Sequence, residues 1–358
     1  MQLKQAIFRA ARSAGMFSIL RDSPWRRRRL LIVCYHGVSM DDEHEWSPSL
    51  YVTQDRLRAR LQALRDGGYT ILPLADATER LYAGTLPPRS VALTFDDGAV
   101  DFERRALPVL REFNAPATLY LTTYYCLHRL PVFDTVLSYV LWKGRDSGAD
   151  LASIVGSAQP MPVSPDSERN ATRQRLREHA AALGLSAGEK DVLVARVAGR
   201  LGVNYDAIKA RGTLQIMAPD TVRGLPGDLV DVQLHTHRHR TPIDHDQFVR
   251  EIRDNDAVIR ELRIGAPAPT HFCYPSGDYH GEFFDWLHEC QVQYATTCVP
   301  DLVSRDAYPL LLPRLVDTME QSALTFEAWA SGFAALLPKR RAFRLDPERL
   351  TVGEAVRG

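Results

Sequence analysis

The chain has 358 residues, enough for one large α/β domain or two smaller ones, and the 45% hydrophobic and 25% charged residues are typical of a globular protein. Forty-four basic residues balance forty-four acidic ones, so no overall charge draws the protein to nucleic acid, and we expect no nucleic-acid partner. The five cysteines have no paired spacing, which argues against a disulfide framework and favours a reducing compartment.

Residues 1–29 form a basic extension in which apolar side chains such as Phe8 and Phe17 mix with Lys4 and Arg12. This pattern predicts an amphipathic helix, which either rests on an anionic membrane or covers one end of the main domain. The apolar run at 30–35 is shorter than a secretory core of about 7–15 residues, and no stretch reaches the ~20 apolar residues of a membrane span. We therefore expect a cytoplasmic protein, with a peripheral contact at the inner face of the membrane as an option.

From residue 30 on, strand-like and helix-like segments alternate. Apolar runs predict strands at 30–35, 69–72, 91–95, 117–121, 230–234, 271–274, 293–297 and 310–315. Apolar residues at helical spacing predict helices at 56–66, 100–113, 247–262 and 281–290. Repeated alternation implies parallel strands joined by right-handed crossovers, and hence an α/β barrel or a doubly wound sheet.

The alternation stops between residues 127 and 212, where strand signals are few and charged helical patterns cover 170–183 and 189–201. We interpret 127–212 as a mostly helical insertion at the mouth of the barrel, where insertions usually shape access for the substrate. The predicted organisation is the extension 1–29, a first part of the barrel at 30–126, the insertion, the remainder at 213–340 and a C-terminal tail at 341–358.

Two polar segments follow predicted strands. Asp96 and Asp97 come after the strand at 91–95, and His235 and His239 after the strand at 230–234. One carboxylate and two histidines would bind a divalent metal and leave room for a water, while the spare carboxylate would take a proton from that water. The alternatives are a capping Asp-Asp-Gly turn and a solvated basic turn.

The spacing within the second segment supports the metal interpretation. If the chain turns helically after the strand, His235 and His239 lie on one side and can share one metal, while His237 points elsewhere. A histidine pair at this spacing is short and matched easily by chance. The histidine pair indicates a metal site only in combination with the acidic pair at the end of another strand.

The segments Thr-Phe-Asp-Asp-Gly (94–98) and His-Thr-His-Arg-His (235–239) resemble the first two motifs of the NodB-homology polysaccharide deacetylases, carbohydrate esterase family four. The resemblance implies an irregular (β/α)7 barrel, to which the helical insertion is added. By position, Asp96 resembles the catalytic base, and the metal triad corresponds to Asp97, His235 and His239. Thr236 matches a hydroxyl that stabilises the loop. The implied reaction removes an N-acetyl group from an amino sugar with one divalent metal, for which we expect Zn²⁺ before Co²⁺, Ni²⁺, Mn²⁺ or Fe²⁺.

The later motifs depart from the family pattern. Tyr274, Pro275, Ser276 and Gly277 keep the Tyr-Pro-x-Gly part of the third motif without its arginine. We expect these four residues and Thr236 to contact the substrate, with the Tyr274 N–H or a neighbouring one helping to stabilise the oxyanion.

The family's final motif, Leu-x-x-His, which carries the proton donor, is replaced by Leu-Pro-Arg-Leu at 312–315. The segment Cys-Tyr-His-Gly-Val (34–38) instead resembles the opening of a permuted branch that includes poly-N-acetylglucosamine deacetylases. This resemblance implies that His36 is the general acid and that Arg314 orients Asp96. The alternatives are a buried strand-end histidine and a structural ion pair.

Three other functions are alternatives to the deacetylation of an N-acetylated carbohydrate substrate. The iron(II) facial triad also uses two histidines and a carboxylate, but in a His-x-Asp spacing that this chain lacks. A catalytically inactive carbohydrate-binding barrel and a deacylase acting on formyl or O-acetyl groups remain open. Within the deacetylase interpretation, we expect a sugar intermediate of capsule or exopolysaccharide assembly.

Overall fold

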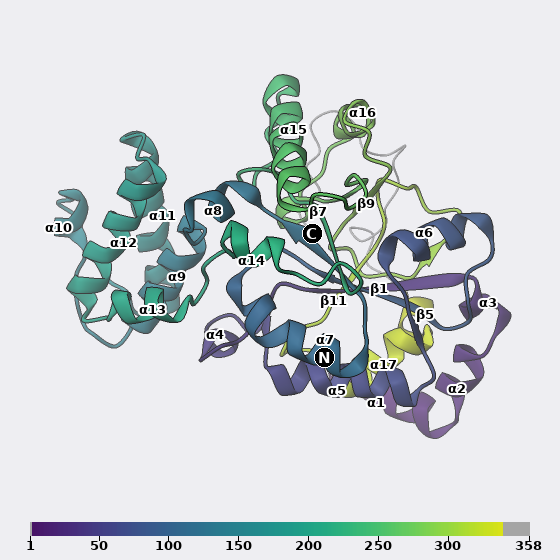
Figure 1. Ribbon diagram of the computed structural model, residues 1–358. Coiled ribbons are helices and arrows are strands. Elements are labelled where there is room, and N and C mark those ends of the chain that lie inside the picture. Colours follow the sequence, from purple (N-terminus) through teal and green to yellow (C-terminus); the bar gives the residue numbers. More distant parts are fainter. Residues whose placement is uncertain (1, 339–358) are drawn as a thin grey trace.

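The computed structural model describes residues 2–338, so the predicted tail at 341–358 and the last residues of the segment 213–340 lie outside the described residues. Six strands pair in parallel and curl into a barrel (Figure 1). They are β1 (Arg29–Tyr35), β5 (Ser90–Phe95), β6 (Ala117–Leu121), β7 (Val230–Leu234), β8 (His271–Cys273) and β9 (Tyr294–Thr296).

A seventh segment, 312–316, joins the two edges of this sheet. Leu312 pairs in parallel with Thr296 of β9, and β11 (Leu315–Val316) pairs in parallel with β1. Only β11 is regular strand, because Pro313 has no N–H to donate to a neighbouring strand. The predicted strand at 310–315 is therefore mostly irregular, but the irregular (β/α)7 barrel is confirmed.

The remaining strands are short and lie around the barrel. They are β4 (Thr70–Ile71), which pairs with β5, β10 (Val303–Ser304), which pairs antiparallel with β1, and the separate pair β2 (Gly37–Val38) and β3 (Tyr51–Val52). The barrel strands themselves are buried on both faces, as the apolar runs predicted; every residue of β5 and of β6 is buried.

Helices connect the strands as the alternation predicted. They are α4 (Glu43–Trp46), α5 (Gln54–Asp66), α6 (Leu74–Ala83), α7 (Leu107–Phe113), α8 (Thr123–His128), α14 (Pro219–Arg223), α15 (His245–Leu262) and α16 (Phe283–Glu289). The predicted helix at 100–113 is divided into a π-helical turn, η1 (Phe102–Ala106), and α7. Pro108 explains the change, because it cannot donate the hydrogen bond that an α-helix needs at this position.

The stretch 127–212 is helical and stands to one side of the barrel (Figure 1). Its helices are α9 (Phe133–Lys143), α10 (Ala152–Val155), α11 (Asp166–Ala182), α12 (Ala187–Leu201) and α13 (Tyr205–Arg211). They share a hydrophobic core of their own, which includes Tyr139, Leu176 and Val194. A capping box between Ser186 and Glu189 begins α12 and fixes where its first turn lies.

The N-terminal extension covers the barrel end at which the strands begin. Its helices α1 (Gln2–Ser13), α2 (Met16–Arg21) and α3 (Pro24–Arg27) pack near α17 (Ala323–Ser331) and η3 (Phe333–Leu336). Phe8 and Phe17 are buried against Phe333, with ring centroids 6.1 and 5.3 Å from it. Buried Arg26 donates to the carbonyl of Ser90, where β5 begins. Within residues 2–338, no helix is long and apolar enough to cross a membrane.

Candidate active site

The two polar segments meet at the ends of β5 and β7. Asp97 Oδ1 lies 3.2 Å from His235 Nε2 and 3.1 Å from His239 Nε2. The three ligand atoms all lie within 4.8 Å of one another. Only 2% of the His235 side chain is exposed, against 29% of Asp97 and 21% of His239, so the group is open on one side. This leaves a face for a water or a substrate.

The histidine segment does not turn helically, so the predicted reason for the pairing is wrong. Thr236 and His239 instead adopt left-handed backbone angles, with φ of 61° and 53°, which bring the imidazole rings of His235 and His239 to 5.0 Å. Asp97 is also left-handed, with φ 70°. Such conformations cost energy for residues other than glycine and gather at functional sites.

Gly98 lets the chain turn directly after Asp97. Its φ is 84°, and a Cβ at this position would lie 2.3 Å from a methyl group of Leu121. A larger residue would clash there, so glycine is what allows the acidic pair to sit against the end of β6.

Buried hydrogen bonds hold the histidines in place. His235 Nδ1 lies 2.9 Å from the carbonyl oxygen of Cys273, so Nε2 is the nitrogen that faces Asp97. The backbone N–H of His235 donates to Asn255 Oδ1 at 2.8 Å, and that of Arg240 donates to the Thr236 hydroxyl at 3.1 Å. His237 points away, as predicted, and pairs with Thr123 at 2.8 Å.

Asn255 was not predicted from the sequence, although a signal for it exists. It occupies a position in the apolar stripe of α15, between Ile252 and Ile259, and it is completely buried. A polar residue in an apolar stripe needs a partner. Here the partners are the His235 backbone, the Leu121 carbonyl and the Thr123 hydroxyl.

The residues present fit a divalent metal. One carboxylate and two neutral imidazoles form a common set of ligands for such ions. Burial by itself would raise the pKa of Asp97, but His239 and His235 hold that pKa well below its usual range, so the carboxylate is ionised. Two other groups that could hold a metal both include Asp96, whose oxygens are already engaged by Arg314. Among residues 2–338, the group of Asp97, His235 and His239 is therefore the one available to a cation.

Asp96 lies beside this group, in a buried ion pair. Both of its oxygens accept hydrogen bonds of 2.8 Å from Arg314, and the two side chains are 2% and 0% exposed. Burial raises the pKa of Asp96, but the charge and hydrogen bonds of Arg314 outweigh it and lower that pKa below its usual range. The remaining Arg314 donors reach Thr297 and Thr94, so the buried guanidinium is well satisfied.

His36 faces the same carboxylate from the end of β1. Its Nε2 lies 3.6 Å from Asp96 Oδ2, and its side chain is 20% exposed. Burial lowers the pKa of His36, while Asp96 and Asp97 raise it in part, so this imidazole is neutral at neutral pH. A neutral imidazole next to a carboxylate can accept a proton and pass it on.

Three thiols surround the Asp96–Arg314 pair, which the scattered cysteine spacing did not indicate. Cys34 and Cys273 donate from Sγ to Asp96 Oδ2 at 3.4 and 3.5 Å, and Arg314 donates to Cys298 at 3.8 Å. Burial raises the pKa of all three thiols, so they remain protonated. Arg314 also donates to Cys273 Sγ at 3.0 Å, so the thiols act as weak donors or acceptors and enclose the ion pair without adding charge.

A cavity of about 700 Å³ contains these groups and is bounded by both the barrel and the insertion. From the predicted site it is lined by His36, Asp96, Asp97, His235, His239, Tyr274 and Ser276. Thr236, Pro275 and Gly277 are not among its lining residues; the hydroxyl of Thr236 supports the loop instead. The Tyr274 hydroxyl donates to Leu310 and its N–H to Thr296, so the predicted use of this N–H for the oxyanion has no support.

Comparison with known proteins bears on this geometry. Residues 83–137 match the family model described as polysaccharide deacetylase. The poly-beta-1,6-N-acetyl-D-glucosamine N-deacetylase of Escherichia coli (strain K12) is 34% identical over 101 residues, which are 28% of this chain and 15% of that protein. The chain thus aligns with less than one sixth of this relative's length.

Two solved structures share the fold. The deacetylase PplD of Streptococcus pyogenes, in complex with acetate, superposes with a TM-score of 0.55 at 16% identity, covering 87% of this chain and 99% of that one. IcaB from Ammonifex degensii superposes with a TM-score of 0.53 at 16% identity, covering 85% and 97%. The family match covers the first motif, 94–98, and the shared fold agrees with it, so the resemblance to the polysaccharide deacetylases is confirmed.

Proposed function

We propose that this chain is a metal-dependent hydrolase that removes the N-acetyl group from an amino sugar of a polysaccharide or glycan precursor. One observation carries the proposal: a single cavity holds both the Asp97–His235–His239 group and the separate pair of Asp96 and His36. Deacetylation of an amide needs this combination of an electrophilic centre, a base and an acid. The Escherichia coli relative, a poly-beta-1,6-N-acetyl-D-glucosamine N-deacetylase, supports the same reaction.

Asp97, His235 and His239 would hold the metal, for which we propose Zn²⁺ before Co²⁺, Ni²⁺, Mn²⁺ or Fe²⁺. When bound, such an ion lowers the pKa of a coordinated water toward about 7 and polarises the acyl carbonyl. The protein's own contribution is to fix the three ligands, through the hydrogen bonds to Cys273 and Asn255.

Asp96 and His36 move the protons. Asp96, oriented by Arg314, accepts a proton from the attacking water at one carboxylate oxygen. Because Arg314 makes Asp96 a weak base, the proton is held only briefly there. His36 Nε2 lies 3.6 Å away, takes this proton from Asp96 and delivers it to the nitrogen of the leaving amine. The products are acetate and a free amino sugar.

Two alternatives predict different outcomes of one experiment. An inactive carbohydrate-binding barrel would need no metal, although the intact ligand set speaks against it. A deacylase of formyl or O-acetyl groups would use the same residues. The test is the metal content of purified protein, paired with acetate release from N-acetylglucosamine oligomers before and after chelation.

We expect one bound metal per chain and acetate release that chelation abolishes and added Zn²⁺ restores. Stoichiometric metal without acetate release, followed by formate release from N-formyl sugars or acetate release from O-acetylated sugars, would favour the second alternative. Protein that binds no metal after reconstitution would contradict the proposal.

We also propose that the N-terminal extension contacts an anionic membrane at its inner face. Leu3, Ile7, Met16 and Ile19 project apolar side chains outward, with 76%, 40%, 46% and 72% of each residue exposed. Residues 1–29 hold eight arginines or lysines and one acidic residue, Asp22. Exposed apolar side chains in a strongly basic surface are what an anionic bilayer attracts.

Vesicle flotation tests this contact. We expect binding to vesicles rich in phosphatidylglycerol and none to phosphatidylcholine alone. The double variant Leu3→Gln, Ile19→Gln should lose the binding. Ile264→Gln removes an apolar side chain that is 89% exposed elsewhere on the surface and should leave it unchanged. Equal binding by both variants would contradict the proposal.

A further inference from the structure

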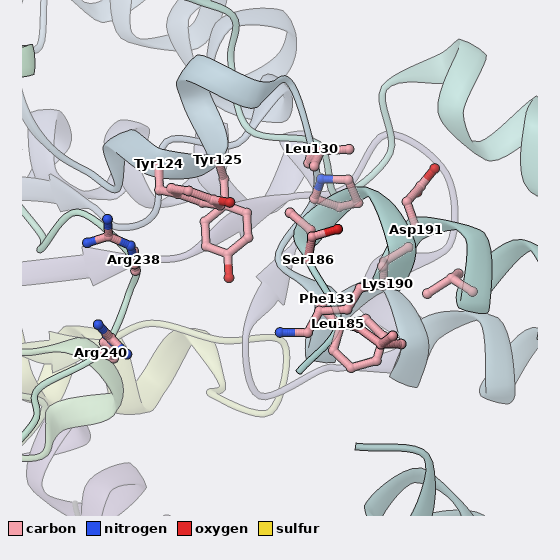
Figure 2. A pocket seen from close by; sticks show the side chains of 14 residues that line it. Tyr124, Tyr125, Leu130, Phe133, Leu185, Ser186, Lys190, Asp191, Arg238 and Arg240 are labelled. Carbon is pink, nitrogen blue, oxygen red and sulfur yellow. The ribbon is translucent and has the colours of Figure 1, made fainter. Parts of the chain in front are cut away.

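A second, smaller cavity of about 270 Å³ adjoins the one that holds the candidate metal site (Figure 2). Its walls come from α8, from the loop after β7, and from α9 and α12 of the insertion. Three side chains, Tyr125, Phe133 and Lys190, line both cavities. A group bound in the smaller cavity therefore lies next to the sugar whose acyl group would be removed.

Lys190 brings an unpaired positive charge to this boundary. Its ammonium makes no ion pair and no hydrogen bond within residues 2–338, and it lies 5.7 Å from the centre of the Phe133 ring. Figure 2 shows the Lys190 ammonium and the Tyr125 hydroxyl directed toward the open centre of the cavity. Lys190 also lies in the first turn of α12, where the positive end of the helix dipole adds to its charge.

The two arginines of this cavity are already paired with acids, unlike Lys190. Arg238 and Arg240 both bond to the buried Glu251, at 3.2 and 2.7 Å. Arg238 also lies 3.6 Å from Asp254.

The one acidic residue of the lining is already neutralised. Asp191 accepts a hydrogen bond of 2.5 Å from the Tyr205 hydroxyl and lies 3.4 Å from Lys209. Lys190 therefore has no opposing charge within the cavity, and a ligand that brings a negative charge would supply one.

We propose that this cavity binds an anionic substituent, a phosphoryl group or a carboxylate, that is attached to the amino sugar or to its neighbour. Lys190 supplies the charge and the Tyr125 hydroxyl a hydrogen bond. This inference rests on the proposed function, because it assumes a sugar in the larger cavity. It goes further by predicting that an anionic amino sugar is preferred over a neutral one.

Equilibrium binding tests the preference without depending on turnover. Isothermal titration at low salt would compare N-acetylglucosamine 1-phosphate and N-acetylmuramic acid with the neutral methyl glycoside of N-acetylglucosamine. We expect an anionic sugar whose substituent fits the smaller cavity to bind about tenfold more tightly than the neutral one. Raised salt should reduce this difference. The comparison of the two anions distinguishes a phosphoryl group from a carboxylate as the natural substituent.

Variants assign the preference to this cavity. Lys190→Met should weaken the anionic sugar about tenfold and leave the neutral one unchanged, and Tyr125→Phe should act in the same direction to a smaller extent. Arg200→Met, which removes a cation from the far end of α12, is the matched control and should change neither affinity.

Equal affinities for the anionic and neutral sugars, or an anion preference that survives Lys190→Met, would overturn the inference. So would the absence of binding by both anions. The proposed function fails separately: if metal-loaded protein releases no acetate from any sugar while anion binding still depends on Lys190, the anion site stands and the deacetylase assignment does not.

Discussion

Arg314 holds Asp96 by two hydrogen bonds of 2.8 Å, one to each carboxylate oxygen, across 218 positions of sequence. The segment that carries Arg314 also joins β9 to β1, so the closure of the barrel delivers this arginine to the acidic pair. A bidentate pair fixes the plane of a carboxylate as well as its charge. Asp96 therefore presents a fixed oxygen to the cavity, beside the candidate metal ligands.

Arg314→Lys keeps the charge but cannot form the bidentate pair. We expect turnover to fall at least tenfold, because the Asp96 carboxylate is no longer held in one orientation. Arg314→Ala should also lower the free energy of unfolding by about 3–5 kcal/mol, since it leaves a buried carboxylate unpaired. Urea unfolding and acetate release measure the two effects.

Arg60 provides the control for this pair. It forms a second buried bidentate pair, with Asp317, at 2.9 and 3.1 Å, and neither residue lines the cavity. Arg60→Lys should lower stability and leave the turnover of the folded enzyme near normal. Equal loss of turnover in both lysine variants would show that the Asp96–Arg314 pair acts only through stability.

Asp96→Asn should reduce turnover by about 10²–10⁴-fold, because the amide cannot accept the water proton. Metal content should remain at the wild-type value, since Asp97, His235 and His239 are unchanged. Metal analysis and acetate release on the same preparation check both statements. Asp317→Asn, in the other buried pair, should keep its activity; an active Asp96→Asn enzyme would refute the base assignment.

His239→Ala should remove the metal, because it deletes one of three ligands and leaves only Asp97 and His235. His237→Ala is the matched control within the same segment, since His237 bonds to Thr123 and points away from Asp97. We expect less than stoichiometric metal in the first variant and full metal in the second. The reverse result would mean that the ligand set is misassigned.

His36→Ala should lower kcat by about 10²-fold while leaving metal content unchanged, because the leaving amine loses its proton donor. The pH dependence of kcat should change with it. An enzyme with the wild-type rate and an unchanged pH–rate profile would place His36 among the structural histidines.

His271 predicts how stability depends on pH. It is buried in β8, 3.1 Å from the Thr78 hydroxyl, and burial lowers its pKa from the ordinary 6.5 to about 3. Below pH 6.5, His271 therefore binds a proton in the unfolded chain but stays neutral in the folded chain. Above pH 6.5 the burial of His271 does not reduce the free energy of unfolding. As the pH falls from 6.5 toward 3, protonation of His271 in the unfolded chain lowers that free energy.

Between pH 7 and pH 5 the loss should be about 2 kcal/mol, which follows from 1.36 kcal/mol for each pKa unit. His271→Gln, whose amide can still bond to Thr78, should show a smaller decrease in unfolding free energy over this range. Urea unfolding at the two pH values measures the difference. Parallel decreases in the wild type and the variant would mean that His271 titrates normally.

The position of the barrel strands could be predicted from the sequence because strands buried on both faces read as continuous apolar runs, as 91–95 and 230–234 do. The acidic pair and the two histidines could be predicted for a related reason, since each follows such a run directly. Carboxyl ends of parallel strands lie on one side of the sheet, so local sequence was enough to bring the groups into one neighbourhood.

The precise surroundings of these groups depended on contacts between distant segments. Asn255 reaches the His235 backbone from α15, and three cysteines from three different segments enclose the Asp96–Arg314 pair. The left-handed angles of Thr236 and His239 replace the helical turn that spacing predicted. No local pattern encodes such features, because each is held by partners far away in the sequence.

The sequence by itself determined which chemical groups this protein possesses and at which strand ends they stand, because periodicity and motif spacing are local properties of the chain. Only the tertiary structure decided which of those groups contact one another. Packing of the insertion against the barrel placed Lys190 beside the cavity that holds Asp97, and closure of the barrel placed Arg314 on Asp96. Distances across hundreds of residues are set by how the whole core packs, and the physical chemistry of the site depends on those distances.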